Sequence, residues 1–162
     1  MAFTLDDVIG GVHASRRFFL KHLAGLREEQ WSWKPYPECK SIRETLIHLV
    51  GDDRAALQSL QTGKEPDYEG ILEAAFAEMA GADTAQVQAQ LEESHEKLCA
   101  HVLALFADAP LDAEACIWGS AMKVGRGVAY LSSEDFYHAG QVAFIRMATD
   151  PAWDYYGSVY GG

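Results

Sequence analysis

Residues 128–148, VAYLSSEDFYHAGQVAFIRMA, carry the pattern that decides the fold class of this 162-residue chain. Apolar residues recur there at the 3.6-residue period of an α-helix. The apolar stripe consists of Val128, Leu131, Val142 and Ile145. Glu134 and His138 fall inside this stripe, so two ionisable side chains are predicted to point into the protein. Burying either one alone costs several kcal/mol, and their i, i+4 spacing lets them share a hydrogen bond or a metal ion.

The same helical period recurs in three further segments. Residues 5–26 follow a capping pattern of Thr4 and Asp7, residues 41–61 begin at Ser41 and Glu44, and a third segment starts at 83 or 84 and ends before Pro110. Each segment predicts an amphipathic helix. The three apolar stripes are Leu5, Val8, Ile9, Val12, Phe19, Leu23 and Leu26; Ile42, Leu46, Leu49, Val50, Leu57 and Leu60; and Val87, Leu91, Leu98, Val102 and Leu105.

The segments between these helices set the connectivity. Pro35 and Pro37 interrupt the first connection, residues 111–127 are irregular, and a long link with one short helix at residues 71–80 joins the second helix to the third. The aromatic residues of the tail, 150–162, are expected to pack on the protein. We therefore predict an all-α four-helix bundle, a single domain over residues 1–162, in which the middle two helices need not be antiparallel neighbours.

Composition narrows the cellular context. The chain has 24 acidic and 13 basic residues and a net charge of −11, which disfavours a nucleic-acid partner. The three cysteines form no metal-ribbon or CxxC pattern, so a reducing compartment is the simpler interpretation. We find no signal-peptide pattern and no apolar run near the roughly 20 residues of a membrane helix. The expectation is a cytoplasmic protein without a membrane partner.

Three stretches resemble the DinB-like (DinB/YfiT) family of proposed metalloenzymes: SIRETLIHLV at 41–50, EDFYHAGQVAFIR at 134–146 and EEQWSWKPYPECKSI at 28–42. The resemblance implies a four-helix bundle of DinB/YfiT-like connectivity and one divalent metal ion. It implies the metal ligands His48, Glu134 and His138, with Gly140 and Gln141 completing the family's H-x-x-x-H-x-G-Q motif. His48 rests on the resemblance alone, because it lies away from the apolar stripe of its own helix.

Glu134 stands where the family more often has histidine. A carboxylate can still ligate the ion, so zinc or nickel is expected first, with manganese or iron as alternatives. Three protein ligands leave a coordination position open, which favours catalysis. The resemblance implies a transferase that uses a low-molecular-weight thiol on an electrophilic small molecule, and Arg126, Arg146 or Arg43 are candidates to receive a substrate carboxylate.

Two other functions stay open from the sequence. One is a metal-dependent hydrolase, in which the ion activates water. The other is a non-catalytic, stress-associated binding protein with a vestigial metal site. Nothing in the residues separates these possibilities from the transferase.

Other candidate residues are given structural roles. His95 and Cys99 are four residues apart, but a surface histidine and a buried thiol are expected there, and His101 points elsewhere. His13 and His22 have no recognisable partner set. Trp31, Trp33 and Tyr36 are expected to be packing anchors. Residues 133–148 are apolar on nearly every side, with Phe136, Ala143 and Met147 opposite the ligands, which predicts a central helix or a homodimer interface.

Overall fold

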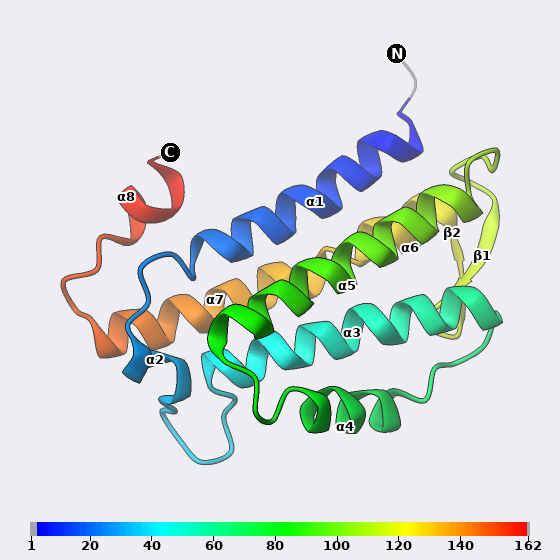
Figure 1. The fold of residues 1–162 in the computed structure, drawn as a ribbon. Coiled ribbons are helices and arrows are strands. Elements are labelled where there is room, and N and C mark those ends of the chain that lie inside the picture. The colour runs from blue at the N-terminus through cyan, green and yellow to red at the C-terminus, as the bar shows by residue number, and fades with distance from the viewer. Residues whose placement is uncertain (1–2, 162) are drawn as a thin grey trace.

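A computed structural model describes residues 3–161 and confirms the all-α bundle. The four long helices are α1 (Leu5–Lys21), α3 (Ile42–Thr62), α5 (Thr84–Leu105) and α7 (Ser133–Thr149). In Figure 1, α1 and α7 run in one direction and α3 and α5 run in the other. The predicted caps are present, because Thr4, Ser41 and Asp83 each accept a hydrogen bond from the backbone three residues later.

The long link between α3 and α5 produces the unusual connectivity. It contains α4 (Tyr68–Glu78), which packs along α3 and carries the chain back to the end where α3 began. Consequently α5 starts beside the start of α3, and the two helices pack side by side in the same direction (Figure 1). The middle helices of the bundle are therefore parallel neighbours.

One predicted helix end was wrong, and one predicted helix is divided. The first helix stops at Lys21 instead of residue 26, and the chain turns through Gly25 at φ +72°, a conformation that ends a helix. The fourth predicted helix is divided into α6 (Val124–Tyr130) and α7, with a turn between them. Leu105, predicted to face the core, is exposed at the last position of α5.

Short elements fill the segments predicted to be irregular. A short helix, α2 (Glu28–Ser32), precedes the proline-containing loop, and a hairpin of β1 (Glu114–Ile117) and β2 (Ser120–Lys123) precedes α6. The two turn residues of the hairpin, Trp118 and Gly119, have φ +54° and +72°, as a type I′ turn requires. A Cβ on Gly119 would lie 2.7 Å from the Cα of Glu65, so the turn packs directly on the link after α3.

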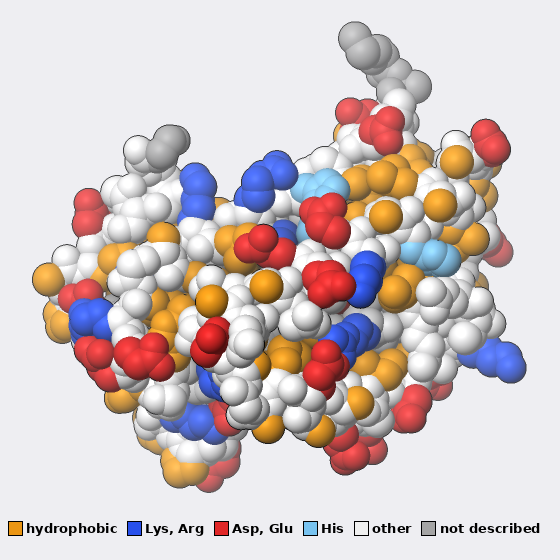
Figure 2. All heavy atoms as spheres, viewed as in Figure 1, with side chains coloured by type: hydrophobic (Ala, Val, Ile, Leu, Met, Phe, Trp, Pro, Cys, Tyr) orange, Lys and Arg blue, Asp and Glu red, His pale blue; other side chains and the backbone are white. Residues whose placement is uncertain are grey.

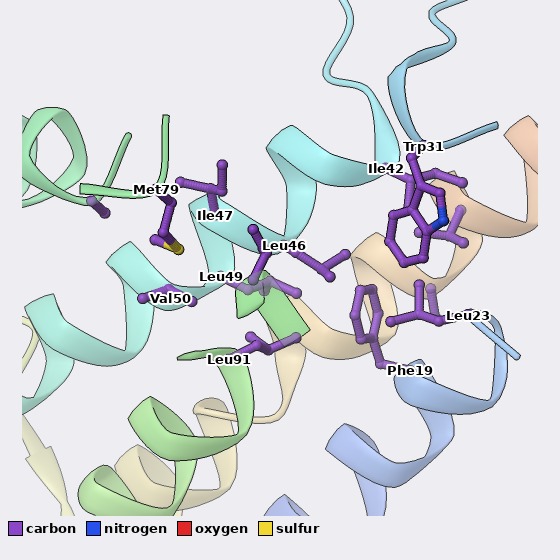
Figure 3. Packing of buried hydrophobic residues seen from close by; sticks show 14 of the residues in the cluster. Phe19, Leu23, Trp31, Ile42, Leu46, Ile47, Leu49, Val50, Met79 and Leu91 are labelled. Carbon is purple, nitrogen blue, oxygen red and sulfur yellow. The ribbon is translucent and has the colours of Figure 1, made fainter. Parts of the chain in front are cut away.

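The core divides into two apolar clusters along the bundle axis. One cluster gathers around Phe19, Leu46 and Leu91, as Figure 3 shows, and also contains Trp31. The other gathers around Val12 and Val102. In α1, α3 and α5 the chain leaves one cluster and enters the other, and between α6 and α7 it does the same; buried polar residues lie between the two clusters. These residues are Ser15 and Arg16 of α1, Asp52 and Asp53 of α3, Ser94 and His95 of α5, and Asp135 and His138 of α7.

Arg16 lies at the centre of this polar layer. Its guanidinium donates to both carboxylate oxygens of Asp53 at 3.1 Å and to Oδ1 of Asp135 at 2.8 Å. Ser94 donates to Asp53 at 2.7 Å, and Ser15 donates to Asp135 at 3.1 Å. The network therefore joins all four long helices. It also fixes the residues beside Asp53 and Asp135 in the sequence, which are Asp52 and Glu134.

The tail returns to the bundle as predicted. Val159 of α8 (Tyr155–Tyr160) is buried, and its carbonyl accepts a hydrogen bond from Lys21 at 3.1 Å. The guanidinium of Arg146 lies 4.1 Å from the centre of the Trp153 ring, which anchors the segment between α7 and α8. No helix within residues 3–161 combines the length and the apolar character needed to cross a membrane.

Candidate metal centre

The structure brings His48, Glu134 and His138 together, from α3 and α7. Asp52 joins them, and one potential ligand atom from each of the four residues lies within 4.8 Å of all the others. The imidazole rings of His48 and His138 meet edge to face, with 4.9 Å between their centres. Two pairs of residues, 82 or more positions apart in the sequence, therefore converge on one point between two helices.

His48 reaches this point because α3 is buried around most of its circumference. The helix packs against α4, α5 and α7, so Ile47, Ala55 and Ala56 are buried although they lie off the predicted stripe. The His48 side chain is 12% exposed and faces α7. The structure thus places His48 beside α7, a position that the apolar stripe of its helix did not predict.

Asp52 is the residue that the sequence analysis missed. Its Oδ2 lies 3.2 Å from Nε2 of His48, one helical turn before it. Tyr68 of α4 donates a hydrogen bond to Oδ1 of Asp52 at 2.7 Å, and its hydroxyl lies 3.3 Å from Nδ1 of His48. The sequence does contain a signal for Asp52 as a ligand, because His48 and Asp52 have the same i, i+4 spacing as Glu134 and His138.

Two buried atoms of the cluster have no hydrogen-bond partner among the described residues: Oδ2 of Asp52 and Nε2 of His138. Nδ1 of His138 is 2.7 Å from Oε1 of Gln141. Because an amide oxygen only accepts, Nδ1 carries the proton and Nε2 keeps a free lone pair. Buried polar atoms without partners are costly, and a cation between them would satisfy both. These residues therefore fit a bound metal ion.

A contact with the Tyr68 hydroxyl holds His48 in the form that binds metal. The Tyr68 hydroxyl donates to Asp52, so its oxygen can accept from Nδ1–H of His48, which leaves Nε2 of His48 free toward the cluster. Glu134 lies at the rim with a 40% exposed side chain, and its Oε2 is 3.5 Å from Nε2 of His138. All four candidate atoms thus present lone pairs to one another.

The pKa shifts agree with this arrangement. Burial lowers the pKa of His48 to about 4, so its imidazole is neutral at physiological pH. Burial raises the pKa of Asp52 to about 6, which still leaves mostly carboxylate at pH 7. The adjacent imidazole of His138 lowers the pKa of Glu134. Neutral imidazole and carboxylate are the forms that ligate metals, and two carboxylates match the charge of a divalent ion.

A cavity of about 390 Å³ adjoins the cluster and is lined by His48, Asp52 and Glu134. The hairpin contributes Trp118 and Met122 to its wall, and the Trp118 ring lies 6.3 Å from that of Tyr68. Further apolar and aromatic side chains complete the wall: Leu49, Leu98, Tyr130 and Leu131. The cavity can hold a small molecule with an apolar part against the metal cluster.

The three predicted substrate arginines do not line this cavity. Arg146 is buried elsewhere and donates to the carbonyls of His22 and Ala24, each at 2.8 Å, while Arg43 donates to the carbonyl of Met79. Arg126 is also absent from the cavity wall. Arg16 does line the cavity, but Asp53 and Asp135 already pair with its charge.

The remaining candidates divide into buried and exposed groups. Trp31 is buried as a packing anchor, whereas Trp33 and Tyr36 are exposed. His95 is 3% exposed, so the prediction of a surface histidine was wrong. On the outer face of α7, Ala143 is buried but four larger side chains are exposed, and the homodimer stays a prediction. These side chains are Phe136, Tyr137, Phe144 and Met147.

Comparison with known proteins agrees with this architecture. A family model described as the DinB superfamily matches residues 12–142, a segment that contains all four residues of the metal cluster. No curated protein matches the chain.

Proposed function

Because the chain belongs to the DinB superfamily, we propose that His48, Glu134 and His138 bind one divalent metal ion, with Asp52 as an additional oxygen ligand. The observation that carries this proposal is the pair of buried atoms without partners, Oδ2 of Asp52 and Nε2 of His138, which lie on facing helices. Two imidazole nitrogens and carboxylate oxygens suit zinc or nickel first, and manganese or iron as alternatives.

We further propose that the protein is a metal-dependent transferase that joins a low-molecular-weight thiol to an electrophilic small molecule. The cavity supports this proposal, because it places an apolar compartment directly against the metal cluster. A bound divalent ion would supply the positive charge that keeps a coordinated thiol deprotonated near neutral pH. The electrophilic small molecule, which accepts the thiol, would lie against Trp118 and Met122.

The protein's own residues have three tasks in this mechanism. Gln141 accepts from Nδ1 of His138 and so fixes the ring with its lone pair toward the cluster. The Tyr68 hydroxyl contacts both Asp52 and His48 and so fixes the positions of the two side chains relative to each other. The apolar wall around Leu49, Leu98 and Leu131 excludes water from the acceptor, which favours thiol transfer over hydrolysis.

Tyr68→Phe is expected to weaken metal binding about 10- to 100-fold, the usual cost of losing a residue that orients ligands. The substitution removes the donor to Asp52 and the partner of His48 Nδ1 but keeps the ring. Competition with a chromophoric chelator measures the change. Tyr130→Phe is the matched control, because Tyr130 lines the same cavity without a hydrogen bond to the cluster. Equal affinities of the two variants would contradict the proposed role of Tyr68.

The transferase is tested by incubating metal-loaded protein with a panel of thiols and a generic electrophile. We expect thiol-dependent turnover that disappears in Glu134→Ala, whose partly exposed side chain makes misfolding a minor concern. Full metal occupancy without thiol-dependent turnover on any electrophile refutes the transferase. Hydrolysis that proceeds without thiol favours the hydrolase, and protein that takes up no metal favours a vestigial site.

A further inference from the structure

A second group of ligand-type side chains lies between α1 and α5 and shares no residue with the first. His13 of α1 meets His95 and Cys99 of α5, and one potential ligand atom from each lies within 4.8 Å of the other two. The sequence analysis found no partner for His13 and placed His95 on the surface. The parallel path of α5 beside α3 changes this, because it brings His95 against α1. We propose that His13, His95 and Cys99 form a second metal site.

The distances in this group approach those of a metal-bound set. Nδ1 of His13 is 3.0 Å from Nε2 of His95, and Sγ of Cys99 is 3.7 Å from the same nitrogen. Tetrahedral zinc with bonds of about 2.0–2.1 Å to nitrogen and about 2.3 Å to sulfur separates two nitrogens by roughly 3.4 Å, and nitrogen from sulfur by roughly 3.6 Å. The first two separations are therefore within about 0.4 Å of these values, and the third, between His13 and Cys99, is within 4.8 Å.

A hydrogen bond explains only part of this contact. Nε2 of His95 has a single hydrogen or a single lone pair, so it can fully satisfy one of its two close neighbours. A cation at the centre of the group would accept a lone pair from each of the three atoms. The three potential ligand atoms thus lie close enough together to share one ion.

Burial gives the group one open side. His95 and Cys99 are 3% and 1% exposed, while the side chain of His13 is 26% exposed. An ion from solvent would therefore reach the group on the side of His13. Oε1 of Glu96 lies 3.8 Å from Nδ1 of His13, so a carboxylate stands at the opening and can supply a fourth ligand. Figure 2 shows a histidine side chain at the surface over α1, with acidic side chains next to it.

Protonation states define what binding requires. Burial, together with Arg16, His13 and Arg17, lowers the pKa of His95 to about 3, so its imidazole is neutral and ready to ligate. Burial raises the pKa of the Cys99 thiol to about 12. Binding therefore exchanges the thiol proton for the metal: the S–H bond breaks, the sulfur–metal bond forms, and the proton leaves to solvent. The charge of Arg16 is balanced by Asp53 and Asp135, and Arg17 is exposed.

The ligand set differs in chemistry from that of the first site. Sulfur with two imidazoles favours zinc or copper, whereas the first site offers only nitrogen and oxygen. An ion bound here would link α1 to α5 directly, across the polar layer. This role is separate from catalysis, so the second site can exist whether or not the first is active.

Cobalt(II) titration of the full-length reduced protein tests this proposal. Only a thiolate ligand gives an intense sulfur-to-cobalt charge-transfer band in the near ultraviolet, so the band reports the second site and is silent for the first. We expect two equivalents of bound cobalt with this band in the wild type. We expect one equivalent and no band in Cys99→Ser, and an unchanged band in a Cys39→Ser/Cys116→Ser control.

Two further variants keep the result interpretable. His138→Ala should lose the first equivalent and keep the band, which separates the two sites. His13→Gln changes a partly exposed residue and should reduce the band at least tenfold at limiting cobalt, even if Cys99→Ser fails to fold. A wild-type protein without the band at excess cobalt overturns the proposal. A band that persists in Cys99→Ser, or is unaffected by His13→Gln, does so as well.

Discussion

Arg16→Met lowers the free energy of unfolding by about 3–5 kcal/mol, the range for removing one partner of a buried ion pair. Arg16, Asp53 and Asp135 are all buried, and both carboxylates depend on this guanidinium for charge balance. Methionine keeps most of the side-chain volume but leaves the two carboxylates unpaired in the core. Urea-induced unfolding measures the change.

Arg17→Met is the matched control, because the adjacent arginine is exposed and its loss should change stability by about 0.5 kcal/mol at most. A second readout is the dependence on pH. Burial raises the pKa of Asp135 even with Arg16 present, and removing the guanidinium raises it further. A raised folded-state pKa means that the folded protein binds the proton of Asp135 more tightly than the unfolded chain does. The loss of stability in Arg16→Met should therefore become smaller as the pH is lowered below 7. Similar losses in both arginine variants would contradict this account of the polar layer.

His138→Ala is expected to abolish measurable metal binding at the first site. The loss of affinity should be well beyond the roughly 100-fold cost of changing a residue that only orients a ligand, such as Tyr68. The substitution removes the buried nitrogen that has no other partner. Affinity is measured by chelator competition in a Cys99→Ser background, so that the other cluster does not contribute. His101→Ala is the matched control, because His101 belongs to neither cluster. Unchanged affinity in His138→Ala would exclude His138 as a ligand.

The helices could be predicted because their signals are local. Capping residues such as Ser41 and apolar residues at helical spacing act within one or two turns, and the four long helices follow them. The hairpin could not be predicted in the same way. Its turn places the bulky Trp118 in a left-handed conformation that such residues rarely adopt, and the turn packs on the link after α3, a long-range contact.

The polar layer also had a signal in the sequence. Each predicted apolar stripe has a gap: between Val12 and Phe19 in the first helix, between Val50 and Leu57 in the second, and between Leu91 and Leu98 in the third. Arg16, Asp53 and Ser94 occupy these gaps. A charged residue at a stripe position indicates a buried partner on another helix, because burial without one is too costly. The sequence does not show which helix supplies the partner.

The candidate site was predictable to a different extent for each residue. Glu134 and His138 follow from spacing within one helix, and Asp52 could have been found from its spacing to His48. The position of His48 depends on how α3 packs against α7, and the meeting of His13 with His95 depends on how the long link places α5. Such long-range packing is not encoded in any local pattern.

Anomalous X-ray diffraction from crystals of metal-loaded protein, collected at the absorption edge of the bound ion, tests the central claim most directly. The account predicts a peak about 2.0–2.1 Å from Nε2 of His48 and Nε2 of His138, with carboxylate oxygens of Asp52 and Glu134 completing the ligands. Full occupancy by metal with no peak between α3 and α7 would contradict it.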